Sequence, residues 1–431
     1  MSGTPAAQPE AETLVRVERA DRALDSFYYL DRDHLNLVCT LLQVLVPTIF
    51  LVLIAGSAAA TPIVSELRIG QHPDKMRLVL ELSEEPTYRV FTLPDPYRVV
   101  IDLPDLDWRP SAAPKVPTGV IRDLRFGLFA PGRSRVVLDA DAPVRLSGVF
   151  VLPPVDGHAY RLVVDIKEVS RQAYANVGRQ VMESKRPLPK ASTAKRAPTK
   201  TDERITVVVD AGHGGIDPGA IGASRVYEKK ITLTYAQALK HRLEATGRYR
   251  VLLTRDSDVF VKLDDRWRFA REAGAGLFLS LHADSHHSRN IRGASVFTLS
   301  SEASDEVAAA LAESANKADL VAGVDLSQHS DDVSNILLDL TRRETQNLSV
   351  RYASMLVESL GKETKLLRNP HRSAGFVVLK AHDVPSVLVE IGFLSNPDDE
   401  KRLRSKPHRR LLTSAIARSI EHYFQWQQAL R

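Results

Sequence analysis

Two histidines and two glutamates in the C-terminal half of the chain could together bind a metal ion and activate water. His213 stands in the segment VDAGHGG and His282 in the segment LSLHAD, each directly after a short apolar run. Glu228 precedes a helical pattern, and Glu390 follows the apolar residues VLV. Two histidines and one carboxylate are a known ligand set of catalytic zinc sites, in which the fourth coordination position is open to water. We therefore take His213, Glu228 and His282 as candidate zinc ligands and Glu390 as candidate general base.

The elements predicted around these residues place them at one edge of a sheet. Strands are predicted over 205–209, 249–253, 276–281 and 386–389, and helices over 230–246, 263–273 and 409–424. This alternation favours an α/β fold with a mostly parallel sheet covered by helices on both faces. Such sheets carry their sites at the carboxyl ends of the strands, where His213, His282 and Glu390 fall.

Other interpretations of single residues stay open at this point. A glycine-rich turn with one histidine also occurs in phosphate-binding loops, and each histidine alone could be structural. The joint pattern at several strand ends favours the metal site. The sequence contains no H-E-x-x-H and no G-x-S-x-G segment, which argues against a zincin and against a serine hydrolase.

The stretch from 205 to 424 resembles the zinc-dependent N-acetylmuramoyl-L-alanine amidases of Gram-negative cell separation. The similar segments are VDAGHGGIDPGA (209–220), EK (228–229), SLHAD (280–284), RGASV (292–296) and VEIGFLSN (389–396). The resemblance implies one Zn²⁺ per chain bound by His213, Glu228 and His282, with Glu390 as catalytic acid and base. It also implies hydrolysis, by zinc-activated water, of the amide between N-acetylmuramic acid and L-alanine of the peptidoglycan stem peptide, in cell-wall remodelling and daughter-cell separation.

Residues 61–170 read as a small all-β domain with an internal repeat. RLVLE (77–81) is similar to RVVLD (135–139), and YRVVID (97–102) is similar to YRLVVD (160–165). We expect two similar sheets packed face to face. The domain resembles the AMIN domain, which implies targeting to peptidoglycan. Residues 171–200 contain eight lysines and arginines and one glutamate. This composition predicts a basic flexible linker at 171–203, followed by an amidase domain at 204–428.

An insertion at about 301–350 separates two of the amidase segments. Helices are predicted over 304–317 and 331–345, and they could pack on the sheet as ordinary core. The resemblance implies instead an autoinhibitory helix that covers the zinc and is displaced by a LytM-domain activator of the division machinery. Glu302 and Glu306 are the nearest candidates for a blocking ligand.

The N-terminus and the composition restrict the compartment and the class of partner. Residues 35–60 contain no charged side chain, and we expect an export signal cut near Ala60 rather than a retained membrane anchor. The mature protein would then lie in the periplasm, without a stable membrane span. The single Cys39 excludes a disulfide framework and a cysteine zinc finger. The net charge is only +5, and the basic linker lacks interleaved aromatic residues, so no nucleic-acid partner is expected.

Two competing functions remain besides the amidase. A different zinc hydrolase of peptidoglycan, such as a carboxypeptidase or a deacetylase, could use the same ligands. A non-catalytic envelope-binding protein would need a missing ligand or base, and the sequence lacks neither.

Overall fold

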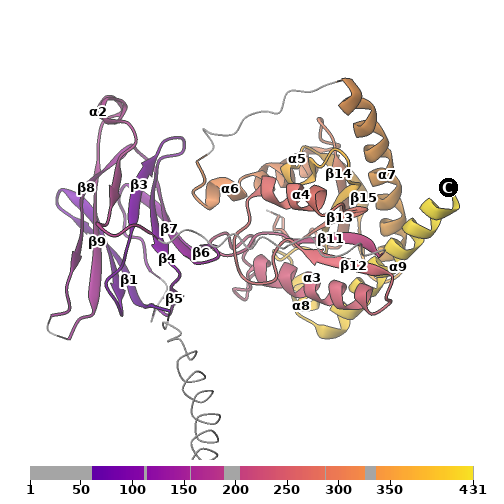
Figure 1. Cartoon of the computed structure of the whole chain (residues 1–431), viewed down its shortest axis with the longest axis horizontal. Coiled ribbons are helices and arrows are strands. Elements are labelled where there is room, and N and C mark those ends of the chain that lie inside the picture. The colour runs from indigo at the N-terminus through magenta and orange to yellow at the C-terminus, as the bar shows by residue number, and fades with distance from the viewer. Residues whose placement is uncertain are drawn as a thin grey trace, which may run out of the picture. The chain divides into compact units, whose positions relative to one another are not determined.

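The computed structural model describes residues 61–110, 114–155, 157–188, 204–286, 288–325 and 336–430 (Figure 1). The expected export signal therefore lies outside the described residues. Within the described ranges, no helix combines the length and the apolar character that a membrane span requires.

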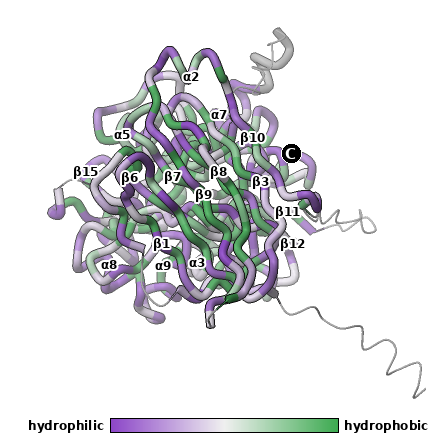
Figure 2. Tube along the Cα trace, turned by 90° about the vertical axis from the view of Figure 1, so that its left-hand side faces the viewer, coloured by the Kyte–Doolittle hydropathy of each residue, from purple (hydrophilic) through white to green (hydrophobic). Residues whose placement is uncertain are grey.

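The N-terminal domain consists of two five-stranded sheets, with the orders β5-β1-β2-β9-β8 and β10-β3-β4-β7-β6. The strands are β1 Ile63–His72, β2 Lys75–Leu82, β3 Arg89–Leu93, β4 Arg98–Pro104, β5 Asp107–Trp108, β6 Ile121–Ala130, β7 Arg133–Ala140, β8 Val144–Leu152, β9 Tyr160–Glu168 and β10 Val181–Glu183. Hydrophobic residues recur along β7, β8 and β9 (Figure 2), and the buried ones join a core to which both sheets contribute. The expected pair of packed sheets is confirmed.

Each of the two sheets contains strands from both sequence repeats. In the first sheet β2 of one repeat pairs with β9 of the other, and in the second sheet β4 pairs with β7. This pairing creates two equivalent ion pairs. Arg77 Nε lies 2.7 Å from Asp165 Oδ1, and Arg135 Nε lies 2.6 Å from Asp102 Oδ1. The repeated arginine and aspartate thus link one repeat to the other within each sheet.

The first part of the expected linker is ordered secondary structure. Helix α2 (Arg171–Val177) is capped by Ser170, whose side chain accepts a hydrogen bond from the backbone of Ala173. Strand β10 then pairs antiparallel with β3. The second sheet therefore takes its edge strand from the segment expected to be a linker, and residues 189–203 lie outside the described ranges.

The C-terminal domain is built on one six-stranded sheet with the order β12-β11-β13-β16-β14-β15. The strands are β11 Ile205–Ala211, β12 Tyr249–Leu253, β13 Leu277–His282, β14 Ala294–Leu299, β15 Leu366–Ala374 and β16 Ser386–Glu390. Strands β12, β11, β13 and β16 are parallel to one another. Strand β14 pairs antiparallel with β16 and parallel with β15.

Helices cover both faces of this sheet, as expected for the predicted α/β class. The helices are α3 Glu228–Glu244, α4 Leu263–Glu272, α5 Glu306–Asn316, α6 Ala318–Val321, α7 Ile336–Gly361, α8 Pro397–Leu403 and α9 Lys406–Ala429, with the 3₁₀ helix η2 Val377–Leu379. Val207 and Val209 of β11 join the core under α3, α7 and α9, whereas Val208 joins the core under α4 and α5. Figure 1 shows α4 and α3 on opposite sides of β11 and β13. The predicted fold class is confirmed.

Candidate metal centre

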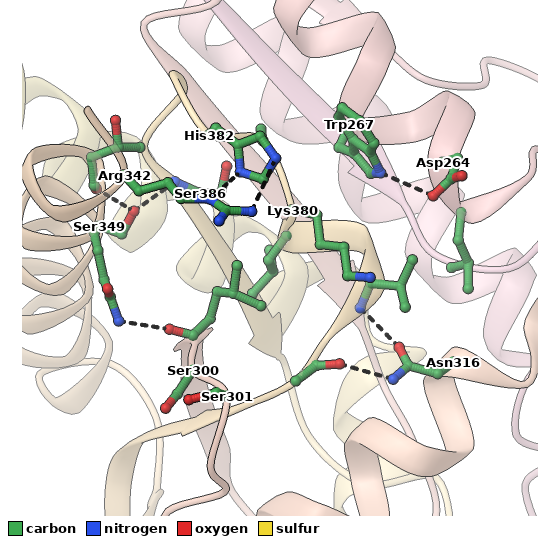
Figure 3. Close-up of a pocket in the computed structure, with 18 of the residues that line it drawn as sticks. Asp264, Trp267, Ser300, Ser301, Asn316, Arg342, Ser349, Lys380, His382 and Ser386 are labelled. Atoms are coloured by element: carbon green, nitrogen blue, oxygen red, sulfur yellow. Dashed lines mark hydrogen bonds between the residues drawn. The ribbon is translucent and has the colours of Figure 1, made fainter. Parts of the chain in front are cut away.

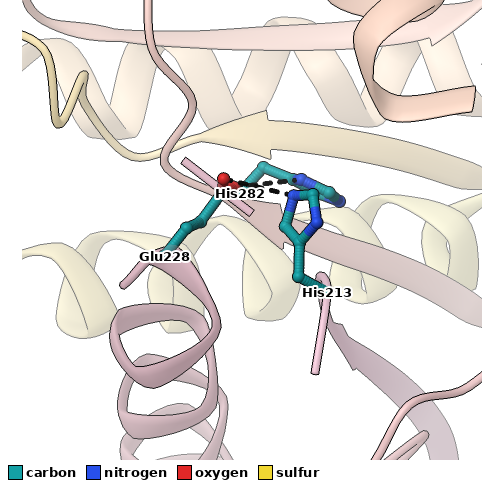
Figure 4. A group of neighbouring side chains, drawn as sticks. All are labelled: His213, Glu228 and His282. Atoms are coloured by element: carbon teal, nitrogen blue, oxygen red, sulfur yellow. Dashed lines mark ion pairs between the residues drawn. The ribbon is translucent and has the colours of Figure 1, made fainter. Parts of the chain in front are cut away.

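His213, Glu228 and His282 converge on one point at the edge of the C-terminal sheet (Figure 4). His213 Nε2 lies 3.2 Å from Glu228 Oε2, and His282 Nδ1 lies 3.2 Å from Glu228 Oε1. One ligand atom from each residue lies within 4.8 Å of the others. The three side chains are 12%, 0% and 9% exposed in that order, so the cluster is almost closed to solvent.

The cluster has the dimensions of a single small metal site. Ligand atoms about 2.0–2.1 Å from a tetrahedral zinc ion lie about 3.4 Å from one another. Each imidazole lies 3.2 Å from one oxygen of the Glu228 carboxylate, and one ligand atom from each residue lies within 4.8 Å of the others. Two imidazoles and one carboxylate could therefore bind one divalent ion and leave a coordination position for another molecule.

The three candidate ligands lie at or near the ends of different elements. Ala211, the last residue of β11, pairs with Leu281 of β13, so His213 and His282 leave the sheet beside one another. His213 has a left-handed backbone with φ of 60°, which a non-glycine residue rarely adopts. At position 212 only glycine fits, because a Cβ atom would lie 2.5 Å from the His282 ring.

The Glu228 carboxylate is oriented by backbone amides. Its Oε2 accepts a hydrogen bond of 2.8 Å from Ala220 N, and its Oε1 accepts one of 2.8 Å from Ala283 N. Burial alone would raise the pKa of Glu228, but His213 and His282 hold this pKa well below the usual value. The carboxylate is therefore ionised, as a metal ligand must be.

Asp217 orients His213 from the side away from the cluster. Asp217 Oδ2 lies 2.8 Å from His213 Nδ1, which leaves Nε2 facing Glu228. Burial would lower the pKa of His213, but Asp217 and Glu228 raise it well above the usual value. Two buried carboxylates thus create a negative environment that favours a bound cation. Asp217 stands four residues after His213 in the segment VDAGHGGIDPGA, and this spacing is the sequence signal for its contact with the imidazole.

Glu390 lies beside His282 on the neighbouring strand. The two residues are register partners in parallel strands, which lie about 4.8 Å apart. Glu390 is 2% exposed, and its Oε2 accepts a hydrogen bond of 3.0 Å from Asp284 N. Burial together with Asp284 and Glu228 raises the pKa of Glu390 well above the usual value. Burial and Glu228 likewise raise the pKa of Asp284 to about 7. Glu390 is thus suited to accept a proton.

Glu302 and Glu306 do not join the cluster. Strand β14 runs away from it, because Ser295 lies opposite Glu390 and the chain continues past Leu299 before reaching Glu302. Both glutamates are exposed, and Glu306 is the first residue of α5. Neither glutamate lies against the three clustered side chains in this arrangement, and the expectation that one of them blocks the metal stays a prediction.

A cavity of about 840 Å³ lies elsewhere on the domain (Figure 3). Its lining includes Trp267, Arg342 and Ser386 but none of the four residues described above. Ser386 is the first residue of β16 and Glu390 is the last, so this cavity reaches the amino end of the strand whose carboxyl end carries Glu390. The candidate residues of the sequence therefore lie outside this cavity.

The structure shows an α/β domain with a two-histidine, one-carboxylate cluster that could hold a metal ion, and comparisons with known proteins identify the family. Residues 207–422 match the N-acetylmuramoyl-L-alanine amidase family, and residues 66–151 match the AMIN domain. The chain belongs to the N-acetylmuramoyl-L-alanine amidase family, and it is an amidase that acts on peptidoglycan.

Individual relatives cover most of the chain. N-acetylmuramoyl-L-alanine amidase AmiC of Escherichia coli is 32% identical over 85% of this chain and 91% of its own length. AmiC of Neisseria meningitidis is 34% identical over 86% of this chain and 92% of its own length. The solved catalytic domain of the amidase CwlV of Bacillus (Paenibacillus) polymyxa is 25% identical, covers 51% of this chain and 98% of its own, and has a TM-score of 0.37.

Proposed function

We propose that the chain hydrolyses the amide between N-acetylmuramic acid and the first L-alanine with the help of one Zn²⁺ bound by His213, Glu228 and His282. The single observation that carries the proposal is the mutual approach of these three side chains within 4.8 Å. When bound, zinc polarises a carbonyl group and lowers the pKa of water towards about 7. The donor set of two imidazoles and one carboxylate suits zinc.

Glu390 is the proposed acid and base of this reaction. Its carboxylate takes a proton from the attacking water and delivers it to the nitrogen of the departing L-alanine. Two features support the role: its place beside His282 and its raised pKa. Asp217 keeps His213 Nδ1 engaged, so that only Nε2 is free to bind the metal.

The proposed setting is the periplasm of a Gram-negative envelope. The match of residues 66–151 to the AMIN domain supports a peptidoglycan-binding role for the β domain, which the sequence predicts at 61–170. A LytM-domain protein is the proposed activator. Adding such a protein to the purified enzyme should increase stem-peptide release, and an unchanged rate with a set of LytM-domain proteins would contradict this part of the proposal.

Digestion of purified sacculi tests the chemistry. The wild-type enzyme, activated where necessary, should release stem peptides with a free L-alanine amino group, and mass spectrometry identifies this new terminus. A metal chelator and the variant Glu390→Ala should each abolish the release. Loss of a terminal D-amino acid would identify a carboxypeptidase instead, and loss of acetyl groups would identify a deacetylase. Release that survives both the chelator and the substitution would end the zinc mechanism.

A further inference from the structure

Two buried arginines bind the backbone of the turn that presents His213. Arg255 and Arg266 are 3% and 1% exposed. Arg255 donates from Nε to Ala211 O at 2.9 Å and from Nη2 to Gly212 O at 2.9 Å. Arg266 donates from Nη1 to Ala211 O at 2.9 Å and from Nη2 to His213 O at 3.0 Å. Three consecutive carbonyl groups are thus held by two guanidinium groups.

This turn needs external support. His213 has a positive φ of 60°, a strained backbone conformation that persists only when surrounding contacts fix it. A buried carbonyl without a donor adds a further penalty. The arginines satisfy the carbonyls of the turn, so they also set the direction in which the imidazole leaves the backbone.

The same two arginines reach the elements of the other two ligands. Arg255 Nη2 also donates to Lys229 O at 2.8 Å and to Thr232 Oγ1 at 3.1 Å, in the part of α3 that begins with Glu228. Thr232 Oγ1 in turn donates to Gly212 O at 2.8 Å. Arg255 therefore joins the helix of Glu228 to the turn of His213.

Arg266 makes the corresponding connection to His282. Its Nη1 lies 2.8 Å from Asp210 Oδ1, and the second oxygen of Asp210 accepts a hydrogen bond of 2.7 Å from Ser280 Oγ. Ser280 precedes His282 by two residues on β13. Asp210 is fully buried, so its charge compensates that of Arg266 inside the domain.

We infer that Arg255 and Arg266 are positioning residues that hold the three ligand-bearing elements in the geometry needed for one metal ion. The inference rests on the proposed metal site and adds to it the residues that preorganise it. Neither arginine has a role in the reaction itself. Each uses its planar fork to bind several carbonyl groups at once, and the single ammonium group of lysine does not reproduce this pattern.

Metal affinity of the full chain tests the inference. Arg255→Lys and Arg266→Lys keep the positive charge but lose the planar guanidinium group with its several donors. Each substitution should weaken Zn²⁺ binding about 10-fold to 100-fold, measured by competition with a chromophoric chelator. Arg271→Lys is the matched control. Arg271 lies on the same helix as Arg266 and pairs with Asp383 at 2.7 Å, away from the turn, so its variant should bind zinc as the wild type does. The absorption spectrum of the Co²⁺-substituted proteins should show altered coordination in the two test variants only.

The outcomes separate this inference from the proposed function. If the wild type binds no metal, the proposed site itself fails. If the wild type binds zinc and both lysine variants bind it with unchanged affinity and an unchanged Co²⁺ spectrum, the arginines are purely structural and the inference is overturned. A purely structural role would lower the melting temperature of metal-free and metal-loaded protein equally.

A milder variant covers the case in which the lysine variants do not fold. Thr232→Val removes the hydroxyl that connects Arg255 with the carbonyl of Gly212, and it keeps the side-chain shape. It should weaken zinc binding several-fold without loss of the fold. Unchanged affinity in this folded variant would count against the inference.

Discussion

The Nδ1 atom of His213 lies 2.8 Å from the carboxylate oxygen Oδ2 of Asp217, within a single glycine-rich turn. Asp217 is 3% exposed and also accepts a hydrogen bond from Gly219 N at 3.1 Å. The carboxylate is therefore fixed from two directions and in turn fixes the imidazole. A carboxylate behind a ligating histidine sets its tautomer and increases its basicity.

Replacement of this carboxylate should weaken metal binding without loss of the fold. Asp217→Asn keeps the shape of the side chain but removes the charge, so we expect about 10-fold weaker zinc binding, measured by chelator competition. The control is Asp256→Asn, which makes the same charge change at an exposed position of the loop after β12. Equal zinc affinity in the two variants would show that Asp217 does not act on His213.

Glu390 should be needed for hydrolysis but not for metal binding. Glu390→Gln removes the proton acceptor and keeps the hydrogen bond from Asp284 N possible. We expect stem-peptide release from sacculi to fall by about 100-fold to 10,000-fold, the usual contribution of a general acid–base group. Zinc affinity of the same preparation is the control and should not change. A variant that keeps more than a tenth of the wild-type rate would show that another group moves the proton.

The sequence predicted four of the six described strands of the C-terminal sheet, and the approach of His213 and His282, because these depend on local patterns. Short apolar runs that end in glycine, histidine or glutamate define strand ends, and parallel strands bring their carboxyl ends together. The predicted strand over 249–253 agrees in both bounds with β12, and the predicted helix over 263–273 differs from α4 by one residue.

Features that depend on pairing between distant segments could not be predicted in this way. The direction of β14 is set by its contact with β16, and this direction carries Glu302 and Glu306 away from the cluster. Strand β10 is short and most of its residues are exposed, so its sequence carries no strand pattern. Only its pairing with β3 makes it part of the sheet. The contacts of Arg255 and Arg266 with the His213 turn were missed for the same reason, because nothing local marks an arginine as buried.

Gly219 should be essential for the metal site because of space as well as backbone conformation. A Cβ atom at position 219 would lie 2.6 Å from Glu228 Oε2 and 2.7 Å from the His213 ring. Gly247 has a similar positive φ, 72° against 64°, but a Cβ atom there would meet nothing within 4 Å. Both Gly219→Ala and Gly247→Ala carry backbone strain of about 1 kcal/mol. Only Gly219→Ala should also lose zinc binding, measured by chelator competition, and equal binding in both would contradict this account of the turn.

The acid stability of the β domain should depend on Asp165. Its hydrogen bond from Arg77, opposed by desolvation, lowers the pKa of Asp165 to about 2, and the side chain is 6% exposed. Because the pKa of Asp165 is lower in the folded protein than in the unfolded chain, where it is about 3.9, the ionised side chain stabilises the fold at pH values above about 3.9. This stabilisation is lost as the pH falls towards about 2. At pH 7 the contribution is about 2 kcal/mol.

Amide hydrogen exchange of β2 and β9, followed by mass spectrometry, measures this contribution. Asp165→Asn should exchange faster than the wild type at pH 5, because the ion pair that joins the two strands is lost. The difference in opening free energy, corrected for intrinsic exchange rates, should shrink between pH 4 and pH 2, where the wild-type carboxylate itself becomes protonated. Asp141→Asn is the control, because the Asp141 side chain is 56% exposed and its ion pair with Arg122 stabilises little. A difference that stays constant down to pH 2 would mean that Asp165 acts through packing and not through its charge.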